Sequence, residues 1–231
     1  FKNAEDRRAA LVDLFRVLDT RDRSSDLRAE LAAFPYVNGD LFRDAAESVP
    51  SINDAANHYI LAAAEFDWID VSPPIFGAMF ESIFNPGNRR AGGMHYTSVE
   101  NIHRVIDPLF LDDLHAEFQA ARRKSKSNRR HALEAFQLKL ASLRFFDPAC
   151  GSGNFLTETY IAIRTLENET IGALRDLGVQ CEVLVSIENF HGIEINDFAV
   201  AVARTALWIA ESQMLKRTAS ILVYADLQML R

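Results

Sequence analysis

One segment, Phe145–Phe155 (FFDPACGSGNF), limits the possible folds more than any other part of this 231-residue chain. An apolar stretch ends in Asp147, a turn with two glycines follows, and a helical pattern continues from Phe155. Glycine permits backbone angles and a close ligand approach that a side chain would block. A helix that begins after such a turn presents free N–H groups and a partial positive charge. The segment therefore predicts a strand, a turn and a helix, with a small polar ligand outside the carboxyl end of the strand.

Apolar strand patterns alternate with helical patterns in the C-terminal part of the chain, which is typical of βαβ units with a parallel sheet. Strands are expected at Leu143–Phe146, Phe190–Ile195 and Ile221–Tyr224. Helices are expected between them, at Phe155–Leu174 and Ala199–Met214. The predicted fold class is therefore α/β with a parallel sheet.

The interval between the first two strands is unusually long. Gly153 and Glu194 are separated by about 41 residues, whereas the corresponding spacing in a simple βαβ unit is about 20 residues. We therefore expect an additional strand or loop near residues 178–186.

The N-terminal third has a helical pattern instead. Leu11, Leu14 and Leu18 recur at helical spacing with charged residues between them. We expect residues 1–74 to form a helical region and residues 75–231 to form the first part of the α/β domain. Near the start of this second region, Thr97 and Glu100 have the spacing of a capping box, and the helix behind them is expected to end before Pro108.

The composition is that of an ordinary globular protein, with 48% hydrophobic residues, 25% charged residues and a net charge of -7. The two cysteines indicate no disulfide framework, and no Cys/His spacing indicates a metal site. The charged N-terminus lacks the apolar core of a signal peptide, and no apolar run reaches the length of a membrane span. We therefore expect a cytoplasmic protein without membrane contact. Because Phe1 is not an initiator methionine, the chain is expected to be a trimmed piece.

Positive charge is concentrated in one segment, with Arg122, Arg123, Lys124, Lys126, Arg129 and Arg130. Such a run is compatible with a solvated helix or connector, and also with a patch that contacts phosphates. Because the chain as a whole is acidic, most of any surface that grips nucleic acid is expected to lie elsewhere.

The glycine turn also restricts the class of ligand. A dinucleotide-binding fold would carry a third glycine where Phe155 and Leu156 stand, and a phosphate-binding P-loop would carry a Lys-Ser/Thr pair. The carboxylate of Asp147 would repel a pyrophosphate. It suits a ligand with an ammonium group, such as the methionine part of S-adenosylmethionine.

Acidic residues follow each of the three expected strands. Asp147 follows the first, Glu194 stands at the end of the second, where it could accept hydrogen bonds from ribose hydroxyls, and Asp226 follows the third, where it could accept from an adenine amino group. The neighbouring Ile195 and Leu227 are placed to pack on the faces of the adenine ring. Because the carboxyl ends of parallel strands share one edge of a sheet, these residues are expected to line one groove.

The segment from Asp147 to Phe155 resembles motif I of the adenine-specific DNA methyltransferases. His95-Tyr96-Thr97 resembles their motif X, Glu194 matches motif II and Asp226 matches motif III. The order X, I, II, III is that of the gamma group of amino-methyltransferases. This resemblance implies a Rossmann-like fold and S-adenosyl-L-methionine as the cofactor. It implies the cofactor-contacting set Tyr96, Thr97, Asp147, Ala149, Gly151, Ser152, Gly153, Asn154, Phe155, Glu194, Ile195, Asp226 and Leu227.

The surrounding segments are similar to MmeI-like methylases of type II restriction–modification systems. These segments include Phe34–Gly39, Arg90–Ser98 and Pro108–Leu114. The resemblance implies that residues 1–74 belong to a helical spacer and that the intact protein acts on double-stranded DNA. It also implies that a nuclease region could occupy the same polypeptide.

Motif IV, an Asn/Asp/Ser-Pro-Pro followed by an aromatic residue, is missing from the chain. Ser72-Pro73-Pro74 precedes motif X and is followed by Ile75, so it does not match. No catalytic residue is therefore assigned, and the chain alone is expected to be inactive. The implied reaction is methyl transfer to the exocyclic amino group of adenine. The alternatives are methylation of cytosine, RNA or protein, and a module that senses S-adenosylmethionine to regulate a linked nuclease without methylating.

Overall fold

The computed structural model describes residues 3–24, 26–34, 36, 42, 49–66, 68, 71–73, 75, 79 and 97–229, and it describes the side chains as far as residue 222. The chain divides into two compact units, Phe1–Asp70 and Val71–Arg231. Each unit is considered by itself. Among the helices that the structure describes, none is both long enough and apolar enough to cross a membrane.

The first unit is helical in its described residues. Its helices are α1 (Ala4–Asp19), α2 (Ala29–Ala32) and α4 (Asp54–Glu65). Asparagine side chains cap both longer helices: Asn3 accepts from the N–H of Asp6 at 2.8 Å and Asn53 from that of Ala56 at 2.8 Å. The start of α1 is joined to the start of α4 by an ion pair between Arg7 and Asp54 at 2.6 Å.

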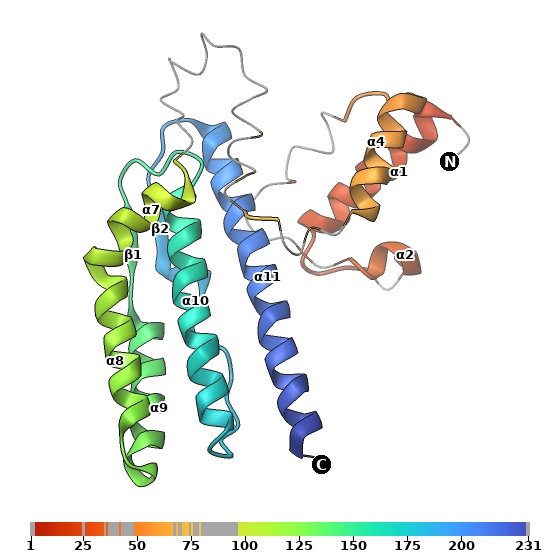
Figure 1. Cartoon of the computed structure of the whole chain (residues 1–231). Helices are drawn as coiled ribbons and strands as arrows, with labels where there is room; N and C mark the ends of the chain where they lie inside the picture. Colours follow the sequence, from red (N-terminus) through yellow and green to blue (C-terminus); the bar gives the residue numbers. More distant parts are fainter. Residues whose placement is uncertain are drawn as a thin grey trace. The chain divides into compact units, whose positions relative to one another are not determined.

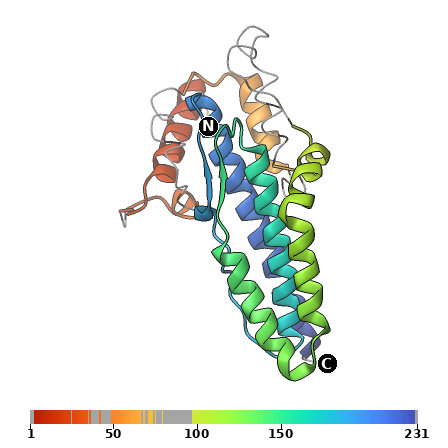
Figure 2. The ribbon, with the colours of Figure 1, turned by 90° about the vertical axis from the view of Figure 1, so that its left-hand side faces the viewer.

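The second unit is an array of long helices with a small sheet at one end (Figure 1). In chain order its elements are α7 (Val99–Ile106), the π-helix η1 (Asp107–Leu111), α8 (Asp112–Arg123), α9 (Lys126–Ser142), β1 (Phe145–Asp147), α10 (Asn154–Arg175), the short 3-10 helix η2 (Ile187–Asn189), β2 (Phe190–Gly192) and α11 (Asp197–Met229). Figures 1 and 2 both show α10 running between α8 and α9 on one side and α11 on the other.

The sheet has two parallel strands in the described residues. Phe145 pairs with Phe190, and Asp147 pairs with Gly192. The Phe145 and Phe190 rings stack with their centroids 4.9 Å apart, and Tyr160 of α10 meets Phe190 edge-on at 5.3 Å. The opposite face carries Phe146, whose side chain is 61% exposed. The expected parallel pairing of the first two strands is confirmed, and one face of the sheet is packed on the helices.

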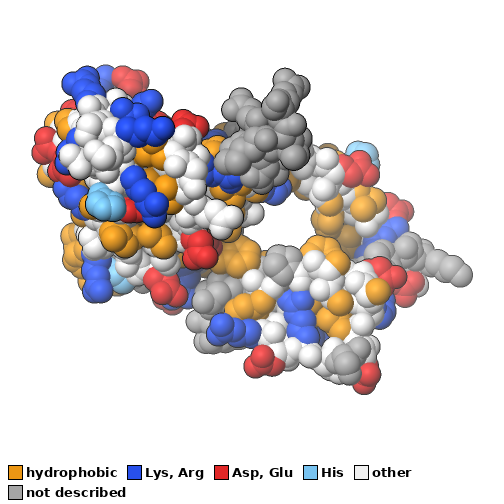
Figure 3. All heavy atoms as spheres, turned by 90° about the horizontal axis from the view of Figure 1, so that it is seen from below, with side chains coloured by type: hydrophobic (Ala, Val, Ile, Leu, Met, Phe, Trp, Pro, Cys, Tyr) orange, Lys and Arg blue, Asp and Glu red, His pale blue; other side chains and the backbone are white. Residues whose placement is uncertain are grey.

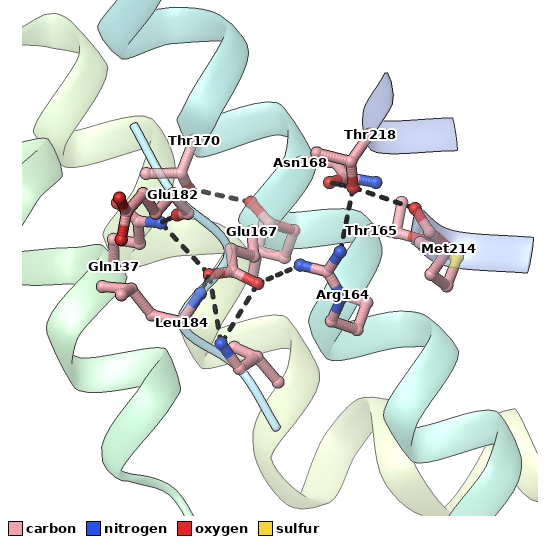
Figure 4. A network of polar contacts seen from close by, with 12 residues as sticks. Gln137, Arg164, Thr165, Glu167, Asn168, Thr170, Glu182, Leu184, Met214 and Thr218 are labelled. Carbon is pink, nitrogen blue, oxygen red and sulfur yellow. Dashed lines mark hydrogen bonds and ion pairs between the residues drawn. The ribbon is translucent and has the colours of Figure 1, made fainter. Parts of the chain in front are cut away.

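A buried polar network joins α10 to α9, to α11 and to the segment before β2 (Figure 4). Arg164 and Glu167, both fully buried, form an ion pair within α10. Glu167 also accepts from the backbone N–H of Leu184 at 2.6 Å and from Gln137 of α9 at 3.1 Å, while Arg164 donates to Thr218 of α11 at 2.9 Å. Because Leu184 lies in the segment that leads to β2, the network attaches that segment to α10.

The expected third strand is wrong. Ile221–Tyr224 lies inside α11, which runs without interruption from Asp197 to Met229. The residues Ile-Leu-Val-Tyr favour a strand, but no glycine or proline stands between Asp197 and Leu230 to end the helix. Propagation of an established helix adds a hydrogen bond with each residue, whereas a strand needs a partner strand beside it.

Two further expectations need correction at α7. The N-cap is Ser98, whose hydroxyl accepts from the N–H of Asn101 at 3.4 Å, so the expected capping box at Thr97 is displaced by one residue. The helix also does not end before Pro108. It continues through η1, in which Asp112 donates to the carbonyl of Asp107 across the wider π turn. This turn accommodates a residue that lacks an N–H group.

The long interval between the first two strands is explained in part by the length of α10, which has 22 residues. The additional segment near residues 178–186 contains neither a helix nor a strand. It is therefore a loop, which was one of the two expected forms.

Candidate cofactor site

The turn between β1 and α10 is shaped by hydrogen bonds within the turn itself. Asp147, the last residue of β1, accepts from the N–H of Ala149 at 3.0 Å through its carboxylate. Gly153 donates to the carbonyl of Cys150 at 2.8 Å. Both Gly151 (φ 53°) and Gly153 (φ 78°) adopt the left-handed conformation that favours glycine. The sequence therefore turns sharply before α10 begins.

Gly153 is required by packing as well as by its backbone angle. A Cβ atom there would lie 2.7 Å from the Cβ of Ala203 in α11, so only glycine lets the starts of α10 and α11 approach this closely. Gly192, at the end of β2, is under a similar constraint, since a Cβ atom would lie 2.6 Å from the sulfur of Cys150. Sequence reasoning missed Gly192. The only signal for it is its place two residues before Glu194.

Parallel pairing continues past the ends of the strands and joins the turn to the segment after β2. Ile193 donates to the carbonyl of Asp147 at 2.9 Å, and Cys150 donates to the carbonyl of Ile193 at 3.0 Å. These two bonds bring the glycine turn against the acidic end of β2. Residues that are more than 40 positions apart in the chain therefore form one edge, as the sequence predicts for the first two of its three expected strands.

Glu194 connects the two sides of this edge. Its Oε1 accepts from the N–H groups of Ile195 (2.8 Å) and Asn196 (2.9 Å), and its Oε2 accepts from the N–H of Gly151 (3.0 Å). A carboxylate offers roughly four lone-pair positions, so these three bonds leave acceptor capacity for a ligand. Asn196 in turn accepts from the N–H of Phe198 at 3.0 Å, at the start of α11.

Two features of this edge fit a ligand that has both polar and apolar parts. Ile195 is 99% exposed, so its side chain is available to cover a ring. Gly153 has no side chain to cap α10, which leaves the first N–H groups of that helix available to a polar or anionic group. These features fit the amino acid, ribose and adenine parts of S-adenosylmethionine.

The side chain of Asn154 is only 5% exposed, so a contact from this residue to a ligand would come from its backbone. Cys150 is half-buried and packs against Gly192. Burial raises the pKa of its thiol, and the carboxylates of Asp147 and Glu194 raise it further. A thiol with a raised pKa carries less thiolate at neutral pH and is therefore a poor nucleophile.

A hollow of about 300 Å³ beside Asp147 was not indicated by the sequence. Its walls are mostly apolar and include Leu109 and Phe110 of η1, Phe146 of β1 and Phe155 of α10. The sequence pattern does not reveal this hollow, because two of its walls come from the π-helix η1. We expected the helix to end before Pro108, whereas η1 continues it past that residue.

Some of the expected site residues are not brought to this edge by the described structure. Tyr96 lies outside the described residues, while Thr97 is half-buried just before α7. Asp226 and Leu227 lie near the end of α11, where the structure describes the backbone but not the side chains. Among the described residues there is no cluster of three or more His, Cys, Asp or Glu side chains that could hold a metal ion.

Comparison with known proteins places the chain among DNA methyltransferases. Residues 121–227 match the family model described as "MmeI, DNA-methyltransferase domain". DNA methyltransferase A of Bacillus subtilis is 42% identical over 204 residues, which cover 87% of this chain and 22% of that protein. A putative type II restriction enzyme and methyltransferase of Methanocaldococcus jannaschii is 25% identical, over 76% of this chain and 18% of that protein.

The fold agrees with these sequence matches. The solved structure of the type IIL restriction–modification enzyme MmeI in complex with DNA matches with a TM-score of 0.79 and 39% identity, over 95% of this chain and 30% of that one. The chain thus spans about a fifth of the length of the curated relatives named here. On the agreement of family model, relatives and fold, this chain belongs to the MmeI-like methylases of restriction–modification systems.

Proposed function

We propose that this chain is the part of an adenine-specific DNA methyltransferase that binds S-adenosyl-L-methionine, in a restriction–modification or phage-defence system. The observation that carries the proposal is the contact between the glycine turn and the end of β2, where the N–H of Gly151 donates to the carboxylate of Glu194 at 3.0 Å. In this proposal the two parallel strands are part of a larger Rossmann-like sheet. Residues 1–74 serve as a helical spacer, and residues 75–231 belong to the methyltransferase domain.

Each part of the cofactor has a proposed holder. Asp147 attracts the ammonium group. The methionine part is surrounded by the glycine turn and the start of α10, with the residues Ala149, Gly151, Ser152, Gly153, Asn154 and Phe155. Tyr96 and Thr97 contact its carboxylate end. Glu194 accepts from the ribose hydroxyls with its remaining acceptor capacity, and Ile195 covers the adenine ring. In the intact protein, Asp226 and Leu227 complete the adenine site, which requires the end of α11 to adopt another conformation.

The cofactor supplies an activated methyl group on a sulfonium centre. The residues of this chain hold that group at a defined position and orientation, so their contribution to catalysis is proximity. The target adenine would be flipped out of the duplex, and its amino nitrogen would attack the methyl carbon directly. The bond between that carbon and the sulfur would break as the new bond forms, S-adenosylhomocysteine would leave, and the methylated amino group would lose one proton to solvent. The groups that hold the base are proposed to lie in other parts of the polypeptide, as are most contacts to double-stranded DNA. A nuclease region in the same polypeptide and a cytoplasmic location complete the proposal.

The first test is calorimetric titration of the protein with S-adenosyl-L-methionine, beside Glu194→Ala and the control Glu169→Ala. Glu169 is exposed on α10, so the control removes the same charge away from the site. We expect Glu194→Ala to bind at least about tenfold more weakly, which corresponds to roughly 1.4 kcal/mol. We expect the control to bind like the wild type. Absence of binding by folded wild-type protein would contradict the proposal.

The second test concerns the reaction. The intact methylase is incubated with duplex DNA and cofactor carrying a labelled methyl group, and the nucleosides are then separated by mass spectrometry. Label on the N6 position of adenine is expected. Label on cytosine, or cofactor binding without any transfer to DNA, would favour the alternatives of cytosine methylation or cofactor sensing.

A further inference from the structure

A surface remote from the proposed cofactor site carries a concentration of positive charge. Its cations are Arg122, Arg123, Lys124, Lys126, Arg129 and Arg130, and this set is called the basic hairpin below. No acidic residue stands between Glu117 and Glu134 in the sequence, although the chain has a net charge of -7. Random placement of charge on an acidic chain does not favour such a run, so the segment needs its own explanation.

The structure places these cations at the tip of a hairpin of two packed helices. α8 ends at Arg123 and α9 begins at Lys126, so the connection between the two helices is only two residues long. The helices are fastened below the tip by the packing of Phe118 on Phe136, with ring centroids 5.8 Å apart. In the view from below, several Lys and Arg side chains lie on the surface of the second unit, with Asp and Glu side chains among them (Figure 3). The positive charges are therefore carried by two helices that pack against each other.

The basic hairpin is only partly neutralised by the protein. Arg130 pairs with Glu134 at 2.8 Å, and Arg122 lies over the Phe118 ring at 5.5 Å. Arg123, Lys124 and Lys126 are exposed, and none of them has an acidic partner among the residues that the structure describes. Three long cations are therefore free to meet an external anion.

The start of α9 adds to this excess of positive charge. Its first turn contains no acidic residue, and Ser125 makes no capping hydrogen bond through its side chain. The N-terminal end of a helix is itself partially positive, so Lys126, Arg129 and Arg130 stand where cations are unfavourable. A bound anion would remove this repulsion, whereas a merely solvated helix start would be more stable with acidic residues.

We propose that the basic hairpin binds the phosphate backbone of duplex DNA, at the end of the second unit opposite the glycine turn. The proposal rests on the proposed function only in taking DNA as the partner. Figure 1 shows the tip and the turn at opposite ends of α10, a helix of 22 residues. At 1.5 Å per residue this separates them by about 33 Å, roughly ten base pairs of duplex. The contact would therefore be independent of base sequence and remote from the reacting base.

The test measures binding of the intact protein to a labelled duplex of about 40 base pairs, long enough to reach beyond both ends of α10. Fluorescence anisotropy is recorded over a salt series for the wild type and for a triple variant, Arg123→Ser with Lys124→Ser and Lys126→Ser. The control triple variant is Arg16→Ser with Arg144→Ser and Lys216→Ser, which removes the same charge from exposed positions outside the hairpin. Cofactor binding is titrated for all three proteins.

Each lost phosphate contact reduces the slope of log K against log[salt] by about 0.9, so the hairpin variant should have a slope shallower by about 2.7. Between roughly 50 and 200 mM salt, its loss of affinity should then be about 40-fold smaller than that of the wild type. The control should retain the wild-type slope, and cofactor binding should be equal in all three. Equal slopes in hairpin variant and wild type would overturn the inference. Absence of duplex binding by wild-type protein that binds the cofactor would also overturn it, while leaving the cofactor site intact.

Discussion

The backbone N–H of Gly151 donates to the carboxylate of Glu194 at 3.0 Å, across 43 residues of sequence. The same carboxylate accepts from the N–H groups of Ile195 and Asn196. Glu194 therefore stabilises the turn before α10 and the segment after β2 together. Because it is also the proposed acceptor for the ribose hydroxyls, a change at this residue should affect both the stability of the edge and the affinity for the cofactor.

Glu194→Gln separates charge from shape at this edge. The side-chain amide retains one oxygen acceptor but places an NH₂ group where a backbone N–H now donates, so at least one hydrogen bond is lost. We expect a loss of about 1–3 kcal/mol in unfolding free energy and weaker binding of S-adenosyl-L-methionine. Urea denaturation and calorimetry measure the two effects. Stability and affinity equal to those of the wild type would show that the carboxylate serves neither purpose.

Gly153→Ala should be among the most damaging single-methyl additions in this chain. The new Cβ would lie 2.7 Å from the Cβ of Ala203. The alanine would also have to adopt the left-handed backbone conformation of Gly153, with a φ of 78°. We expect a loss of at least about 2 kcal/mol in unfolding free energy from the combined strain and overpacking. Gly172→Ala is the matched control, because that position in α10 is open and ordinary in its backbone angle. It should be more stable than the wild type by up to about 1 kcal/mol, again in urea denaturation.

Glu167→Ala should strongly destabilise the folded protein, because Glu167 is at the centre of the buried polar network of α10. Without the carboxylate, the guanidinium of Arg164 stays charged in a fully buried position, and Leu184 loses the acceptor for its N–H. We expect a cost of about 3–5 kcal/mol. The double variant Arg164→Met with Glu167→Gln removes the buried charge and retains an oxygen near Leu184, so it should unfold at a higher urea concentration than Glu167→Ala. The opposite order would show that the ion pair is not the source of the effect.

Glu158 provides a prediction about pH. Burial raises the pKa of this carboxyl, while His103 and Arg217 oppose that shift. A raised folded-state pKa means that the folded protein favours the protonated form. The contribution to stability is therefore present below the unfolded-state pKa and is lost as pH rises through the folded-state pKa.

Glu158→Gln, a neutral side chain of similar shape, should consequently be more stable than the wild type at neutral pH. The advantage should vanish below about pH 4, the ordinary range of a glutamate pKa. Thermal denaturation over a pH series measures this difference. Glu169→Gln is the control for removal of the same charge, since Glu169 is exposed on the same helix. A destabilised Glu158→Gln at neutral pH would show that the carboxylate is needed in its charged form.

The first two strands and their parallel pairing were predictable because their signals are local. An apolar stretch that ends in Asp147 before two glycines has few alternatives, and Glu194 follows the next apolar stretch in the same way. The helix cap at α7 was displaced by only one residue, from Thr97 to Ser98, because neighbouring hydroxyls compete for the same cap. Such short-range patterns depend on a few side chains and their immediate backbone.

The sequence by itself determined the glycine turn, the helix behind it and the two acidic strand ends, because glycine conformation and hydrophobic periodicity act within a few residues. Only the tertiary structure decided that Gly192 must accommodate Cys150, that Glu194 binds Gly151, and that Ile221–Tyr224 continues α11. These features depend on which atoms meet across long stretches of chain. Strand formation in particular requires a partner at its edge, and the intrinsic preference of four residues cannot supply one.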